Sequence, residues 1–131
     1  MDANNATPQI DGNGQPQLNP YMLGSLRFNP PKEYDGTIDD FPDFSFKLKA
    51  YLSLVDHMYP HYMNFAEASE TPLHDGLYVD ANQQPNHAAL NCSRVLFNTL
   101  TMLCTHSALT VVKQLGEAEL NMNGFEAWRR F

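Results

Sequence analysis

The sequence predicts an all-α fold: a compact bundle of about five helices behind an extended, partly disordered N-terminal arm. Three observations predict it. Residues 86–115 are apolar at helical spacing, residues 41–55 repeat that spacing, and residues 123–131 carry an aromatic side chain at every third position. Residues that commonly cap helices stand where the apolar helical spacing of these segments begins. Such agreement between capping residues and apolar spacing is typical of a sequence that specifies one fold.

The stretch 86–115 predicts two helices in series at the centre of the bundle. Apolar side chains surround most of the first helix, which indicates burial on several sides. Asn86 can cap its start through the side-chain oxygen. We expect Ser107 to cap the second helix and Gly116 to end it as a left-handed residue.

The segment that follows contains the start of a last helix. Asn123 is followed three residues later by Glu126, which is the spacing of a capping box. The aromatic residues Phe125, Trp128 and Phe131 then recur on one side. The adjacent pair Arg129 and Arg130 is expected on a solvated helix face rather than at a phosphate site.

An amphipathic helix is predicted from Phe41 to near His57. Asp39 or Asp40 can cap it, and Pro42 is tolerable because a missing N–H matters least in the first turn. Pro60 is expected to end or kink this helix.

A shorter helix can form over residues 62–68, followed by the longest internal loop, residues 69–85. This loop lacks a helical period and contains Pro72, Gly76 and Pro85. Its residues 77–79 could form a short strand or simply an anchor. A loop of this length in a small domain is either mobile or an interaction surface, and the sequence leaves both open.

The core is predicted from apolar residues that recur at helical spacing. It consists of Phe41, Phe44, Leu48, Leu52, Val55, Leu96, Leu100, Leu103, Val112, Leu115, Phe125 and Trp128. Aromatic residues in helices are usually core residues, so the same is expected of all the aromatics in the predicted helices. They are Phe41, Phe44, Phe46, Tyr51, Phe65, Phe97, Phe125, Trp128 and Phe131.

The N-terminal part divides into a flexible tail, residues 1–20, and an extended arm and turn, residues 21–38, ahead of the helical domain, residues 39–131. The tail is rich in Asn, Gln, Pro and Gly. The arm is too apolar to remain in water, so it is expected to lie in a groove of its own subunit or of a neighbour. The candidate subunit contacts are Tyr21, Met22, Leu23, Leu26 and Phe28.

The net charge of the chain argues against a nucleic-acid-binding site in this segment. Eight Lys and Arg stand against fifteen Asp and Glu, a formal net charge of −7, whereas binding to phosphates needs a basic patch. The sequence has neither a signal peptide nor eighteen consecutive apolar residues, so we expect a cytoplasmic protein with no membrane partner.

The sequence predicts no enzyme, no cofactor and no small-molecule substrate. Cys92 and Cys104 are separated by twelve residues of predicted helix, about 18 Å of rise, so they are expected to be free, buried thiols. His57 and His61 have the spacing of two ligands on one helix face, but Pro60 lies between them, and no metal is expected. No nucleophile elbow or phosphate loop occurs.

The order of these elements carries a family resemblance. Tyr34-Asp35-Gly36-Thr37 precedes a helix start, and Lys49-Ala50-Tyr51-Leu52 lies inside the aromatic-rich first helix. A paired apolar helix region then ends at Leu115, before the run Asn123-Gly124-Phe125-Glu126-Ala127-Trp128-Arg129-Arg130-Phe131. This order resembles the N-terminal capsid domain of Gag proteins from long-terminal-repeat retrotransposons of the copia and gypsy types, over about residues 28–131.

The closing run is the most specific part of this resemblance. In the family it would ordinarily continue as Arg-Arg-Leu or similar, and here Phe131 occupies the last apolar place. A fragment of a longer polyprotein is therefore one interpretation of the chain.

The resemblance implies a structural protein that self-associates into a shell around the RNA of the element and performs no catalysis. Its partners would be copies of itself. RNA would be bound only through regions outside this segment, because the second capsid lobe and the zinc knuckle of the family are not in these residues.

Two other classes of function stay open. A monomeric helical adaptor could present a groove to a peptide or a partner helix, for which the 69–85 loop and the apolar arm are the motivation. A small enzyme or metal protein is the third hypothesis.

Overall fold

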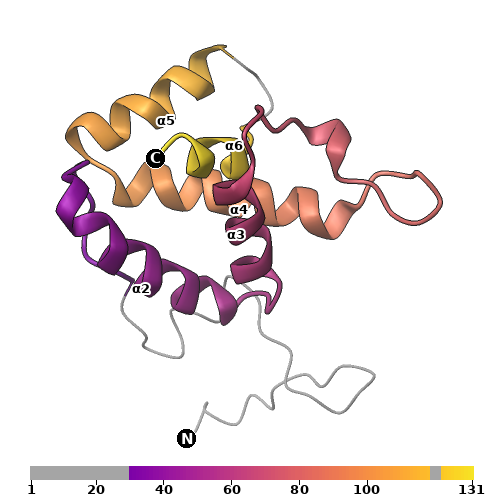
Figure 1. Ribbon diagram of the computed structural model, residues 1–131, viewed down its shortest axis with the longest axis horizontal. Helices are drawn as coiled ribbons and strands as arrows, with labels where there is room; N and C mark the ends of the chain where they lie inside the picture. The colour runs from indigo at the N-terminus through magenta and orange to yellow at the C-terminus, as the bar shows by residue number, and fades with distance from the viewer. Residues whose placement is uncertain (1–29, 119–121) are drawn as a thin grey trace, which may run out of the picture.

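The computed structural model describes residues 30–118 and 122–131, and five α-helices make up most of this part of the chain (Figure 1). They are α2 (Phe41–Ser53), α3 (Tyr59–Ala68), α4 (His87–Leu103), α5 (His106–Ala118) and α6 (Gly124–Arg129), with 3-10 turns at Ile38–Asp40 and Asp75–Leu77. No strand forms within these ranges, so the predicted all-α fold is confirmed. The predicted tail, most of the arm and all five candidate subunit contacts lie outside the described residues.

Helix α2 buries one stripe and exposes the other side. Phe44, Leu48 and Leu52 are buried on the stripe that the spacing predicts. The helix ends at Ser53, earlier than the predicted end near His57. The cause is local: the carboxylate of Asp56 accepts a hydrogen bond from the Met58 N–H (2.8 Å), which closes a turn between two helices.

Pro60 lies in the first turn of α3, which begins at Tyr59. The prediction that Pro60 ends or kinks the preceding helix is therefore wrong. A proline in the first turn lacks an N–H that would have no partner within the helix, and its fixed φ suits a helix start. The same rule applies to Pro42 in α2, where the prediction is confirmed. Asp40 stands at the cap position of α2, although its side chain makes no capping hydrogen bond.

Asn86 caps α4 as predicted, since its side-chain oxygen accepts from the Ala89 N–H at 3.2 Å.

Both predicted ends of α5 are wrong. The helix begins at His106, so Ser107 lies inside the first turn, and its hydroxyl donates to the Asp35 carbonyl (3.1 Å) instead of capping.

Gly116 lies within α5 rather than after it. The glycine has no left-handed backbone, and the helix continues to Ala118. A Cβ atom at this position would lie 3.1 Å from the Cζ atom of Phe97 on α4. The glycine therefore allows the two helices to approach each other, which is a packing role and not a helix-ending role.

Helix α6 lies in the middle of the molecule, against α3 and α4 (Figure 1). Asn123 caps it, and the side-chain oxygen accepts from the Glu126 N–H at 2.9 Å, as the sequence predicts. Gly124 faces the backbone of α4: an added Cβ would lie 2.5 Å from the Phe97 nitrogen and would collide with the Ser93 carbonyl oxygen. Only a glycine allows α6 to approach this closely.

The segment before α2 is joined to the junction of α4 and α5 by backbone hydrogen bonds. The Tyr34 N–H donates to the Leu103 carbonyl (2.9 Å), and the Tyr34 carbonyl accepts from the Thr105 N–H (2.9 Å). Gly36 has φ 102° and abuts Ser107, so a side chain would be excluded there both by conformation and by space. These bonds position the start of the helical domain.

The 69–85 loop is anchored and does not form a strand. The Tyr78 carbonyl accepts from the Asn86 N–H at 2.9 Å, and the Tyr78 ring packs on Phe125 with the ring centroids 5.5 Å apart. Of the two alternatives left open by the sequence, the structure therefore contains the anchor. Beyond Tyr78 the loop projects from the bundle (Figure 1), and the Asp80 carboxylate accepts from the Asn82 N–H in the turn at its tip.

Candidate interaction surface

The predicted core residues lie in one cluster. Ten of the twelve are buried, and the other two, Phe41 and Val55, are half-buried and pack against the cluster. The expectation that the aromatic residues of the predicted helices are core residues is wrong for two of the nine. Phe46 is 76% exposed and Phe65 is 56% exposed, because each lies on the side of its helix away from the core.

An aromatic cluster joins α2 to the end of the chain. Tyr34 stacks on Phe44 with ring centroids 4.8 Å apart, and Phe41 lies 5.3 Å from Trp128. Phe131 packs edge-on against Trp128 at 5.8 Å. Aromatic pairs in such arrangements contribute about 0.5–1.5 kcal/mol beyond the area that they bury. The cluster therefore stabilises the contact between α2 and α6.

Glu126 is a buried carboxylate that joins α6 to the 69–85 loop. Its side chain is 1% exposed and accepts from the Leu73 N–H at 2.8 Å. Arg129 donates to both carboxylate oxygens at 2.7 and 2.9 Å, and Arg130 donates to one of them at 2.7 Å. Only half of the predicted capping box forms, because the carboxylate turns to these partners rather than back to the Asn123 N–H.

The surroundings of Glu126 hold it in the charged form. Burial acts to raise the pKa of its carboxyl, but hydrogen bonds from Arg129, the Leu73 amide and Arg130 outweigh burial and lower the pKa to about 2. The expectation of a solvated face is therefore wrong for Arg129, whose side chain is only 20% exposed, whereas Arg130 remains exposed. Their charges are paired with a buried carboxylate, and the pair is part of the framework.

The two cysteines are free and buried, as predicted. Burial raises the pKa of the Cys104 thiol to about 12. Burial, followed by the carboxylate of Asp56, raises the pKa of the Cys92 thiol to about 12 as well. The Tyr59 hydroxyl, also buried, donates to the Cys92 carbonyl at 2.9 Å. Both sulfurs are therefore protonated and unreactive at neutral pH.

We expect Cys92 and Cys104 to react with an aromatic disulfide reagent at pH 7 only as fast as the protein opens. The thiolate is the reacting form, and both thiols are buried with a raised pKa. Absorbance of the released thiol, followed with and without 8 M urea, measures this. The single variants Cys92→Ser and Cys104→Ser assign each phase, and a fast stoichiometric reaction of either thiol in the native protein would contradict the expectation.

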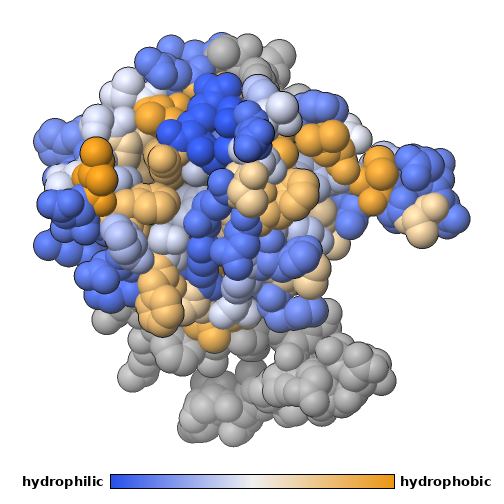
Figure 2. All heavy atoms as spheres, viewed as in Figure 1, coloured by the Kyte–Doolittle hydropathy of each residue, from blue (hydrophilic) through white to orange (hydrophobic). Residues whose placement is uncertain are grey.

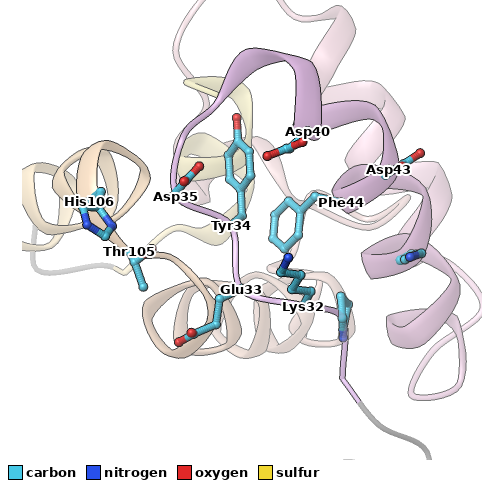
Figure 3. A pocket seen from close by; sticks show the side chains of 11 residues that line it. Lys32, Glu33, Tyr34, Asp35, Asp40, Asp43, Phe44, Thr105 and His106 are labelled. Carbon is cyan, nitrogen blue, oxygen red and sulfur yellow. The ribbon is translucent and has the colours of Figure 1, made fainter.

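A hollow of about 430 Å³ lies between the segment before α2, helix α2 and the start of α5 (Figure 3). Tyr34 and Phe44 lie at its centre, with acidic and basic side chains around them. The hollow is lined by Pro31, Lys32, Glu33, Tyr34, Asp35, Asp40, Asp43, Phe44, Lys47, Thr105 and His106. Asp35 serves the local turn, since its carboxylate accepts from the Thr37 N–H at 2.9 Å. Hydrogen bonding from the Thr37 side chain, followed by its N–H, lowers the pKa of the Asp35 carboxyl.

The histidines do not come together. His57 lies before α3 and His61 within it, so the pair does not share a helix face. All five histidines are exposed. Across the described ranges, no three His, Cys, Asp or Glu side chains converge in a way that could hold a metal ion.

An apolar surface lies on the exposed side of α2. Phe46 lies between two grooves, of about 400 and 630 Å³. The first is lined by Pro30, Pro31, Lys32, Phe46, Lys47, Ala50, Tyr51 and Leu54, and the second by Phe41, Pro42, Ser45, Phe46, Lys49, Ala50, Pro60 and Glu67. We call this surface, centred on Phe46 with Pro42 and Ala50 beside it, the Phe46 face.

Other exposed apolar side chains lie apart from the Phe46 face. Ile38 is 84% exposed before α2, and Met102 is 79% exposed at the end of α4. Figure 2 shows apolar residues as separate patches among hydrophilic ones on the side in view. None of the helices in residues 30–118 and 122–131 combines the length and the apolar character needed to cross a membrane.

The sequence interpretation missed the surface position of Phe46, although a signal was present. Phe44, Leu48 and Leu52 already form the buried stripe, and Phe46 lies about 200° around the helix from Phe44. An aromatic residue so far from the stripe indicates a second apolar side. The burial of Glu126 had no such signal, because its partner Leu73 is remote in sequence.

A scan against protein-family models finds no match to this chain, and searches of curated proteins and of solved structures find no significant similarity. The resemblance to a capsid domain accordingly rests on the residues quoted for it.

Proposed function

We propose that this chain is a structural self-assembly domain, similar to the N-terminal capsid domain of retrotransposon Gag proteins, that contributes to a shell around the RNA of the element. The observation that carries the proposal is the Phe46 face. This phenylalanine is 76% exposed and, with Pro42 and Ala50 beside it, lines two grooves, and an apolar patch beside a groove is a common mark of a protein interaction site. The all-helical fold agrees with the resemblance but does not by itself indicate a function.

The buried polar groups support a structural role. Glu126, Arg129 and Arg130 bind one another and the 69–85 loop, and the two thiols are protonated. These groups stabilise the fold and are not directed into the hollow beside Tyr34. In this proposal the chain works in the cytoplasm, where free cysteines stay reduced. RNA is bound by regions outside this segment, consistent with its net charge of −7.

The 131-residue chain is expected to form oligomers that grow with concentration. Burial of apolar surface between copies supplies about 25 cal/mol per Å², and repetition of weak contacts builds an assembly. Sedimentation velocity from micromolar to millimolar protein, in low and moderate salt, measures the mass. A strict monomer throughout this range, together with failure of a longer protein that contains the chain to assemble, would contradict the proposal.

A monomeric adaptor is the second candidate function, and the grooves on either side of Phe46 favour it. An apolar groove beside a helix is a common site for a short helix or an extended peptide. The same sedimentation experiment separates the two candidates, because an adaptor stays monomeric and forms a complex of defined mass with its peptide.

A further inference from the structure

We infer that the Phe46 face binds the Phe46 face of a second copy, with the two α2 helices antiparallel about a two-fold axis. This inference rests on the proposed self-assembly and specifies one of its interfaces. Its central contact is between the two Phe46 rings, flanked on each side by an ion pair between Asp43 of one copy and Lys47 of the other.

The apolar part of the contact comes from one side of α2. Pro42, Phe46 and Ala50 succeed one another at four-residue intervals, so they form a row along the exposed side of the helix. The groove of about 630 Å³ beside this row is lined by Pro42, Phe46 and Ala50 of α2 and by Pro60 of α3. An aromatic ring from a second copy can enter this groove and cover the exposed ring.

The charges of α2 are complementary to themselves in the antiparallel direction. Asp43 and Lys47 are both exposed and four residues apart, so they lie on the same side of the helix, about 60° and 100° around from Phe46. Figure 3 shows the Asp43 side chain pointing outward from α2. No ion pair within residues 30–118 and 122–131 engages either residue.

A two-fold axis beside residue 45, midway between Asp43 and Lys47, places each aspartate opposite the lysine of the other copy. The same axis brings the two Phe46 residues within about 3 Å of each other along the helix direction, since the rise is about 1.5 Å per residue. A parallel arrangement would instead put like charges side by side. The apolar and charged residues of α2 therefore favour one and the same register.

The remaining charged side chain of α2 is already bound. Lys49 pairs with Glu67 of α3 (2.7 Å) and donates to Asn64 (2.7 Å) at the edge of the larger groove. One helix side buries less than the roughly 800 Å² per partner of a standard interface, so this contact is weak as an isolated dimer. A weak two-fold contact suits an assembly in which every copy also uses other surfaces.

The first test replaces the central ring by a charged side chain. Phe46→Asp is expected to raise the dissociation constant of self-association about tenfold or more, by loss of a central aromatic contact. Phe65→Asp is the matched control: Phe65 is an exposed phenylalanine of the neighbouring helix that lines neither groove. The control is expected to leave the dissociation constant within about twofold, and thermal melts of both variants are expected to match that of the parent.

The second test uses charge exchange. Asp43→Lys and Lys47→Asp should each weaken self-association about three- to tenfold, because two attractive pairs become repulsive. An equimolar mixture of these two variants should recover association, since every cross pair is then attractive. Fluorescence transfer between differently labelled variants at low salt measures the mixed dimer. Repulsion within a single helix cannot produce this recovery.

The outcomes separate this interface from the proposed function. If the parent chain associates and neither the Phe46 variant nor the charge variants change its dissociation constant, the α2 pairing is wrong and self-assembly uses another surface. Weakening by Phe46→Asp without recovery in the mixture overturns the antiparallel register. A parent chain that is monomeric at millimolar concentration overturns the interface. The proposed function is overturned as well only when a longer protein that contains the chain also fails to assemble.

Discussion

Replacing Gly124 by alanine is expected to lower the free energy of unfolding by about 3 kcal/mol, the upper end for overpacking in a core. The added Cβ would lie 2.5 Å from the Phe97 nitrogen and 2.8 Å from the Leu96 Cβ, and would collide with the Ser93 carbonyl. Two of these three atoms belong to the backbone of α4 and cannot rotate away. Helix α6 must therefore shift as a whole. Urea unfolding followed by circular dichroism measures the loss.

Gly76→Ala is the matched control for this change. A Cβ at Gly76 would lie 3.2 Å from the Nδ1 atom of the exposed His74 side chain, which is free to turn. Its expected effect is less than about 1 kcal/mol. Equal effects of the two substitutions would show that the close approach of α6 to α4 is not what Gly124 provides.

Replacing Glu126 by glutamine is expected to destabilise the protein by about 3 kcal/mol at pH 7. The variant keeps the shape of the side chain, but the charge that binds Arg129 and Arg130 is lost, and an amide cannot accept all of their hydrogen bonds. A carboxyl pKa lowered from 4.5 to about 2 corresponds to a similar free energy. Glu117→Gln, on the exposed side of α5, is the control, with an expected effect below about 0.5 kcal/mol.

The contribution of Glu126 should also depend on pH in one direction. Because folding lowers the pKa of this carboxyl, the unfolded chain takes up the proton first as the solution is acidified. The stabilisation is complete above about pH 4.5 and is lost as the pH falls toward 2. The difference between the parent and Glu126→Gln should shrink over that window in urea titrations. A difference that stays constant from pH 7 to pH 2 would contradict the assigned role.

The features that were predictable from the sequence depend on neighbours along the chain. Asn86 and Asn123 cap helices through residues three positions away, so both caps follow from local spacing. The buried stripe of α2, which includes Leu48, follows from the helical period. Proline is ambiguous even at this level: Pro60 can end one helix or begin another, and the turn at Asp56 decides which.

Features that depend on remote partners could not be predicted. Ser107 looks like a helix cap, but the Asp35 carbonyl, 72 residues away in sequence, accepts from its hydroxyl. Gly116 looks like a helix end, but the Phe97 ring on another helix explains the glycine. The Glu126 carboxylate accepts a hydrogen bond from the Leu73 amide instead of bonding back to the Asn123 N–H as the capping box predicts. In each case a tertiary contact outweighs a local preference of about 1 kcal/mol.

The central position of α6 has a consequence for synthesis of the protein on the ribosome. Phe125 and Trp128 fill the middle of the core, yet they are translated after helices α2 to α5. Helices α2 to α5 emerge from the exit tunnel first, and the apolar sides that pack on α6 stay exposed until α6 emerges. Apolar surface exposed in this state is prone to aggregate, and completion of the domain is delayed until Gly124–Arg129 has left the tunnel.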